Sequence, residues 1–259
     1  MYNRIKSFVF YLISNHHYYM KKNFFIISLT FILGLASCSF TTREFNESDR
    51  DKLLMQIISY VLDQGHFVKK DINDEFSKKV FNDYMQRIDP YKRYFYKSDI
   101  EEFKKYEYEL DDQFLNAQAD FFELTYNRSQ LRFNESQSIY KEILGKPFNY
   151  QLDEDFNADF ESLDYVSNKE EMKDRWRKQL KFSSIESYND LLEEEENELD
   201  ENPSYEKKSN SEIEAEARES TLKTLDEMYD FYDDIDRSSS FAFYINSFVE
   251  QYDPHTIYY

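Results

Sequence analysis

Apolar residues recur at helical spacing along most of the chain. Over residues 50–65 they fall at the i, i+3 and i+4 positions that line one face of a helix, which predicts a first helix there. A second helix is expected from Asn73 or Asp74, and it should stop before Asp89-Pro90, because a proline disfavours helical geometry in the residue that precedes it. The apolar positions of the first predicted helix are Leu53, Leu54, Ile57, Ile58, Val61 and Leu62. Those of the second are Phe76, Val80, Phe81, Tyr84, Met85 and Ile88.

A long third helix, with room for a kink, is expected next. Ser98 and Glu101 have the spacing of a capping box, in which each side chain accepts a hydrogen bond from the other residue's free amide. From there the pattern continues to Leu144, and 145–147 (Gly-Lys-Pro) should end the helix.

In the second half of the chain, the sequence pattern predicts shorter helices and two irregular stretches. Residues 146–166 are acidic and have no regular period, and 193–211 is a charged, Pro-containing stretch expected to be a mobile loop. The remaining pattern predicts four helices, over about 172–182, 187–199, 213–232 and 241–249. We therefore predict an all-α fold, an irregular multi-helix domain over 50–250 with one long helix and a charged mobile loop.

Composition supports a packed helical domain and argues against nucleic acid as a partner. The 259 residues include only 3 Gly and 4 Pro, fewer than sheet-rich domains need for their turns, whereas 24 Phe and 23 Tyr supply core material. Four of the 32 basic residues and none of the 52 acidic ones precede Cys38, so the rest of the chain is strongly acidic. Such a surface repels phosphate backbones and anionic lipid headgroups.

The N-terminus has the layout of a secretory signal. Lys21 and Lys22 open a positive region, 12 mostly apolar residues follow, and residues 35–38 (Leu-Ala-Ser-Cys) resemble a bacterial lipobox. This resemblance implies cleavage before Cys38 and a diacylglycerol on its thiol, hence a membrane-anchored lipoprotein of the periplasm; the alternative is an ordinary signal peptide with an incidental cysteine. We therefore expect an upstream extension plus signal peptide over 1–37 and a lipidated tether over 38–49.

Sequence motifs give little support for metal or cofactor chemistry. After Cys38 the histidines are His66 and His255, too few for a common zinc cluster, and a structural role is expected for both. Residues 153–164 partly mimic a calcium loop, but Ala158 replaces the glycine of the sharp turn and Asp164 replaces the bidentate glutamate, so a solvated acidic loop is favoured. No catalytic residue, metal or cofactor is expected. For Trp176 we expect a ring packed in the core beneath basic side chains.

Four stretches, in order, resemble the N-terminal helical domain of tail-specific, or carboxy-terminal processing, proteases. They are "GHFVKKDINDEFSKKVFNDYMQRIDP", "FFELTYNRSQLRFNESQSIYKEIL", "RWRKQLKF" and the closing "QYDPHTIYY". The matching positions that we single out are His66, Asp89, Pro90, Trp176, Asp253, Pro254, His255 and Thr256.

The resemblance implies a non-catalytic scaffold or docking domain. Proteases of this family continue after the Asp-Pro-His-Thr segment with a PDZ domain and a Ser/Lys catalytic domain, so 251–259 is expected to begin the junction to a PDZ domain that this chain lacks. By the same resemblance its partners are protein substrates or an adaptor lipoprotein, in proteolysis of envelope proteins. The alternative is a free-standing acidic lipoprotein that binds a protein partner.

Overall fold

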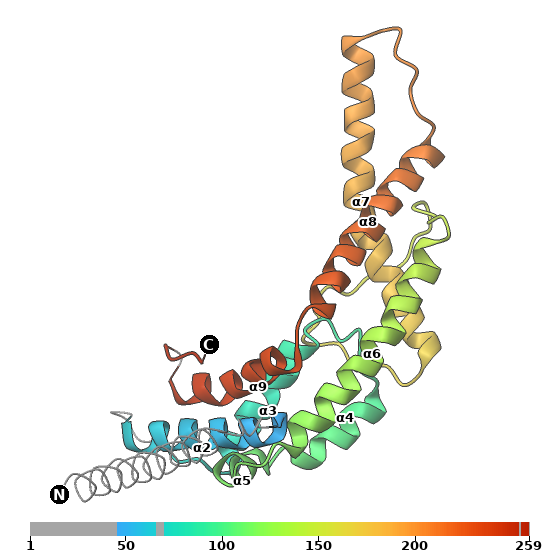
Figure 1. The fold of residues 1–259 in the computed structure, drawn as a ribbon. Helices are drawn as coiled ribbons and strands as arrows, with labels where there is room; N and C mark the ends of the chain where they lie inside the picture. The colour runs from blue at the N-terminus through green and yellow to red at the C-terminus, as the bar shows by residue number, and fades with distance from the viewer. Residues whose placement is uncertain (1–45, 66–69, 254, 259) are drawn as a thin grey trace, which may run out of the picture. The chain divides into compact units, whose positions relative to one another are not determined.

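Every regular element in the described residues, 46–65, 70–253 and 255–258, is a helix in this computed structural model (Figure 1). Eight α-helices and one short 3₁₀ helix occur there, and that part of the chain contains no strand. The predicted all-α fold is confirmed.

The first two predicted helices are present. Helix α2 (Glu47–Gly65) begins three residues before the expected position, and α3 (Asp74–Ile88) has the expected bounds. The Asn73 side chain caps α3 by accepting hydrogen bonds from the amides of Glu75 and Phe76. The Asp89-Pro90 step follows α3 directly, as the sequence indicates.

The prediction of one continuous third helix is wrong. The chain forms α4 (Lys97–Phe103), the 3₁₀ helix η1 (Lys104–Tyr106), α5 (Leu110–Leu115) and α6 (Asp120–Leu144).

Tertiary hydrogen bonds cause these breaks. The Ser77 hydroxyl, on α3, accepts the Leu110 amide, and the buried Gln113 side chain accepts the Phe121 amide at the start of α6. Ala117 takes a left-handed backbone with φ of 53°, which no continuous helix allows. The expected capping pair is also wrong, because Asp99 rather than Glu101 accepts the amide that precedes α4, that of Tyr96.

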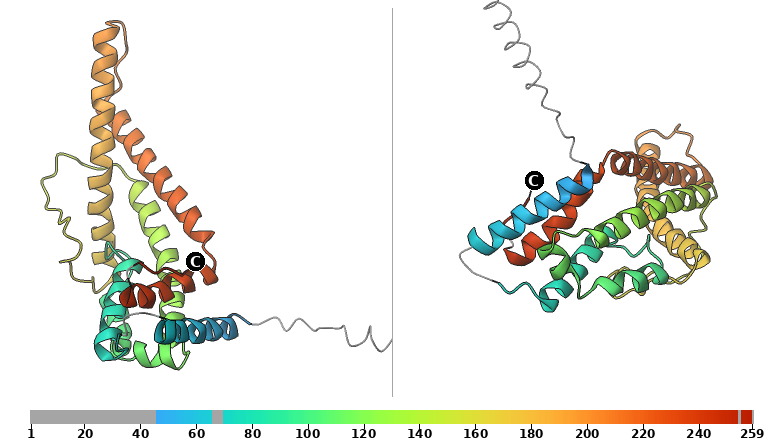
Figure 2. Two further views of the ribbon diagram at one scale, coloured as in Figure 1. Left: turned by 90° about the vertical axis from the view of Figure 1, so that its left-hand side faces the viewer. Right: turned by 60° about the horizontal axis from the view of Figure 1, so that its bottom comes forward.

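The second half contains fewer and longer helices than predicted. A single helix, α7 (Lys169–Glu201), spans both helices predicted between 172 and 199, and α8 (Asn210–Asp233) and α9 (Arg237–Tyr252) match the last two. Helices α7 and α8 form an antiparallel pair joined at its far end by residues 202–209 (Figures 1 and 2).

The expected loop over 193–211 is accordingly too wide. Residues up to Glu201 belong to α7, and only the connection 202–209 is irregular. Glu195 explains the difference, because its buried carboxylate accepts the Tyr205 hydroxyl and the Lys208 amide. The connection thus folds back on α7 and supplies hydrogen-bond donors to the carboxylate of Glu195.

Two apolar clusters form the core. The first joins α2, α3, α5, α9 and the start of α6, and the second joins the rest of α6 to α7 and α8. The extended residues 94–96 lie between them: Phe95 belongs to the first cluster, and Tyr94 and Tyr96 belong to the second. Successive side chains of an extended segment point to opposite sides, so this short stretch connects both clusters.

Candidate functional site

Asp89 organises the loop that follows α3. Its carboxylate is 1% exposed and accepts the amides of Arg93, Tyr94 and Phe95 at 2.9, 3.2 and 3.0 Å. Burial raises the pKa of Asp89 to about 6, against the opposing effect of the three backbone hydrogen bonds. Lys92, inside this turn, has a positive φ of 46°.

Trp176 of α7 packs on the same loop, so the structure brings together two positions that lie far apart in the sequence. Its buried indole donates to the Arg93 carbonyl oxygen at 2.8 Å, and the Arg93 guanidinium lies 4.6 Å from the ring centroid. The expected packing of Trp176 beneath a basic side chain is confirmed, although the side chain is Arg93 rather than its sequence neighbours. Arg175 instead donates to the carbonyl oxygens of Lys92 and Asp164.

A buried ion pair that the sequence did not reveal fixes α4 to α6. Asp99 is fully buried and accepts two hydrogen bonds from Arg132, at 2.8 and 2.9 Å, and another from Arg128. Burial would raise the pKa of Asp99, but the two guanidinium groups hold it below its ordinary value. The four-residue spacing of Arg128 and Arg132 indicates that both lie on one face of a helix, but nothing in the sequence identified Asp99 as their partner.

Asp253 forms hydrogen bonds to His255 and Thr256 just after the end of α9. The carboxylate of Asp253 accepts the His255 amide at 3.1 Å and the Thr256 hydroxyl at 2.9 Å. His255 is exposed. The motif therefore has a structural explanation, a turn stabilised by an aspartate side chain.

Asn246 holds the residues after this turn against α9. Its side chain accepts the Tyr258 amide at 2.7 Å and donates to the Tyr258 carbonyl oxygen at 2.9 Å. Helix α9 is in turn fixed to α3, because Arg87 donates to both carboxylate oxygens of Glu250. The sequence analysis missed Asn246, since its partner is backbone that any residue could supply.

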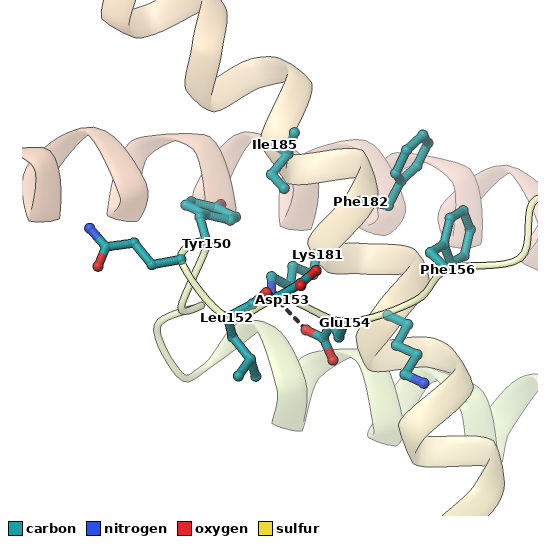
Figure 3. Close-up of a pocket in the computed structure, with 10 residues that line it drawn as sticks. Tyr150, Leu152, Asp153, Glu154, Phe156, Lys181, Phe182 and Ile185 are labelled. Atoms are coloured by element: carbon teal, nitrogen blue, oxygen red, sulfur yellow. Dashed lines mark hydrogen bonds and ion pairs between the residues drawn. The ribbon is translucent and has the colours of Figure 1, made fainter.

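A cavity of about 360 Å³ opens between residues 150–156 and α7 (Figure 3). Lys181 lies at its base and pairs with Glu154 at 2.6 Å, and its ammonium also donates to the Leu152 carbonyl oxygen. Hydrogen bonds from Arg177 and Lys181 lower the pKa of Glu154 to about 2. The acidic stretch 153–164 is therefore partly neutralised by α7.

None of these clusters contains a hydroxyl paired with a lysine. In the part of the chain that the structure describes, no serine hydroxyl shares a hydrogen bond with a lysine ammonium. Ser184, one turn from Lys181, bonds instead to the Lys181 carbonyl oxygen and the Tyr150 hydroxyl. The same described residues contain no group of three or more His, Cys, Asp or Glu side chains that could hold a metal ion.

Several sequence predictions lie outside the described residues. These are the signal peptide and lipidated Cys38, His66, and Pro254. Among the helices that are described, none combines the length and the apolar character needed to cross a bilayer.

The chain is therefore a helical domain in which buried polar side chains such as Asp89 and Asp99 fix loops and helices to one another. The chain matches the family model described as the tail specific protease N-terminal domain over residues 58–259, and it belongs to that family. It is also similar to the tail-specific protease of Haemophilus influenzae, with 30% identity over 97 residues, which are 36% of this chain and 14% of that protein. The match thus covers only a small part of the relative's length.

Proposed function

We propose that this chain is the non-catalytic scaffold and docking domain of a periplasmic tail-specific serine protease that degrades or trims envelope proteins. Membership of the N-terminal domain family supports the role of a domain that accompanies a protease. Its partners are protein substrates or an adaptor lipoprotein, and cleavage is carried out by a PDZ and Ser/Lys region linked to it.

The attachment of Asp253 and residues 255–258 to α9 carries the proposal. The Asp253 turn, the Asn246 bonds to Tyr258 and the Arg87–Glu250 pair hold this segment in a fixed direction relative to α3 and α9. A linked domain would then be presented to unfolded polypeptide at a defined geometry, which is the function of a scaffold.

The size and activity of the gene product in native cells test the proposal. An antibody against this chain should detect a protein well above the 31.7 kDa of the chain, and the immunopurified protein should cleave an unstructured peptide with an apolar C-terminus. Asn246→Ala should slow this cleavage several-fold, whereas Asn127→Ala, at an exposed asparagine of α6, should not. A product no larger than 31.7 kDa without cleavage would favour the free-standing lipoprotein instead.

We place the protein at the periplasmic side of a membrane through a diacylglycerol on Cys38. The support is the apolar segment followed by Leu-Ala-Ser-Cys. Labelled palmitate should be incorporated into the protein, and Cys38→Ala should abolish the label while the protein is still made. Label that persists in Cys38→Ala would contradict the anchor.

A further inference from the structure

Residues 153–158 form an irregular stretch in which exposed residues alternate with the half-buried Glu154 and Phe156. The start of this stretch lies beside α7 (Figure 3). Asn157 and Ala158 are exposed. Within the described residues, none of the six backbone amides from Asp153 to Ala158 donates a hydrogen bond. A free and accessible row of backbone groups can pair with a second chain in the way that the edge of a sheet does.

Apolar side chains line the cavity next to this stretch. Phe156 stacks on Phe182 of α7 with ring centroids 4.7 Å apart, yet Phe182 remains 57% exposed. Leu152 is 54% exposed, and Tyr150 and Ile185 complete the apolar lining (Figure 3). The volume of about 360 Å³ is sufficient for one or two large side chains.

The charges at this cavity favour a basic ligand over an acidic one. Lys181 is paired with Glu154, and Lys178 has Asp174 at 3.5 Å, so both cations already have partners. Asp153 lines the cavity and Asp155 follows two residues later; both are exposed, and neither forms an ion pair with another described residue. An incoming lysine or arginine would find free carboxylates, whereas a carboxylate would have to displace an existing ion pair.

We propose that residues 150–158 and α7 form a groove for an extended segment of an unfolded protein. The segment pairs with the backbone of 153–158, places an aromatic or long aliphatic side chain in the cavity, and sets a neighbouring lysine or arginine beside Asp153 and Asp155. Because Lys178 and Lys181 are already paired, the groove does not require a free C-terminal carboxylate. The inference deepens the proposed docking role by naming the surface and the chemistry of what it binds.

Fluorescence anisotropy of the purified chain with a labelled nonapeptide tests the groove. The probe contains one Phe flanked by two Lys in a Gly/Ser background, and its C-terminus is amidated. We expect saturable binding that weakens about tenfold when the probe's Phe is replaced by Ala, when its Lys are replaced by Glu, or when alternate backbone amides are N-methylated.

Variants of the chain assign the binding to this surface. Phe182→Ala should weaken binding about tenfold, and Phe231→Ala, at an exposed phenylalanine of α8, should leave it unchanged. Circular dichroism of both variants checks that the helices are intact, as expected for exposed side chains.

Three results would overturn the proposal: no binding of the probe, equal binding by Phe182→Ala, or tighter binding of the probe with a free carboxylate. A change from dimer to monomer in Phe182→Ala, without peptide binding, would assign the surface to self-association and also contradict it. Peptide binding is measured without proteolysis, so the groove can fail while the protease assignment stands. Conversely, the groove can bind the peptide even if the native gene product proves to be a free-standing lipoprotein.

Discussion

The indole of Trp176 donates a hydrogen bond to the carbonyl oxygen of Arg93, a residue 83 positions earlier in the chain, at 2.8 Å. The bond joins the N-terminal part of α7 to the loop that Asp89 organises, and Tyr94 in that loop packs edge-on against the indole ring. One side chain thus connects the second core cluster to the segment that reaches the first.

Two substitutions of Trp176 should therefore lower the unfolding free energy by different amounts. Trp176→Phe leaves the Arg93 carbonyl without its donor and should cost about 1–3 kcal/mol. Trp176→Ala also leaves a large cavity, so its cost should rise to about 3–5 kcal/mol. Urea unfolding measures both, with Phe231→Ala, at an exposed site, as a control expected within about 0.5 kcal/mol of the parent chain. Equal costs for the two Trp176 variants would contradict the importance of cavity formation.

The buried pair of Asp99 with Arg132 and Arg128 should make stability fall in acid. The pKa of Asp99 is lowered in the folded chain, so its contribution is present above the pKa of the unfolded state and is lost as the pH falls through the folded one. The unfolding free energy of Asp99→Asn should therefore lie furthest below that of the parent chain near neutral pH, and the difference should begin to shrink as the pH falls below about 4. Unfolding free energies at a series of pH values measure this; a constant difference from pH 3 to 7 would contradict it.

Asp89 should give the opposite pH dependence. Its pKa is raised to about 6 in the folded chain, so the stability that it contributes is full below its ordinary pKa and declines as the pH rises through about 6. Relative to Asp89→Asn, the parent chain should lose about 3 kcal/mol between pH 3 and 7, since each pKa unit corresponds to about 1.4 kcal/mol. The same pH series measures this change. If the parent chain instead gains stability relative to Asp89→Asn between pH 3 and 7, the backbone hydrogen bonds to Asp89 outweigh its burial.

Where apolar periodicity and a local cap agree, the sequence was sufficient to predict the helix. Asn73 caps α3, and Asp89-Pro90 ends it, all within one local stretch. Periodicity alone predicted α8 from residue 213, but the capping box of Ser209 and Glu212, which starts the helix at Asn210, was not recognised in the sequence.

Predictions failed where the deciding partner is distant in the sequence. The break before α5 depends on Ser77, 33 residues away, and the helical state of Glu195 depends on Tyr205 and Lys208 in the connection that follows. The site shows the same limit. The sequence indicated Asp89 as the end of a helix and Trp176 as a core residue, but Arg93 joins the two through its backbone amide and carbonyl, which no residue pattern reveals.

Limited digestion with trypsin should begin after Lys207 or Lys208. Both lie in the irregular connection 202–209, which follows the end of α7 at Glu201. The other long irregular stretch, 146–166, offers only Lys146, which precedes a proline. Mass spectrometry of the earliest fragments identifies the site, and first cuts inside α6 would contradict the helix assignment.

The purified chain should not cleave an unstructured peptide with an apolar C-terminus. A Ser/Lys dyad requires a hydroxyl beside a lysine that is kept neutral by burial, and an oxyanion hole of free backbone amides. Lys181 is the buried lysine closest to this description, but its ammonium is bonded to Glu154 and to the Leu152 carbonyl oxygen, and the nearby Ser184 hydroxyl donates elsewhere.

Binding without turnover is the behaviour expected of this surface. The free amides of 153–158 could hold a peptide, but no hydroxyl–lysine pair lies among the described residues to attack it. Incubation with the peptide, followed by mass spectrometry, should show intact substrate at the level of a no-protein control, for the parent chain and for Lys181→Met alike. Turnover that survives repurification and is lost in Lys181→Met would show that this lysine acts as a base, and the non-catalytic assignment would then be wrong.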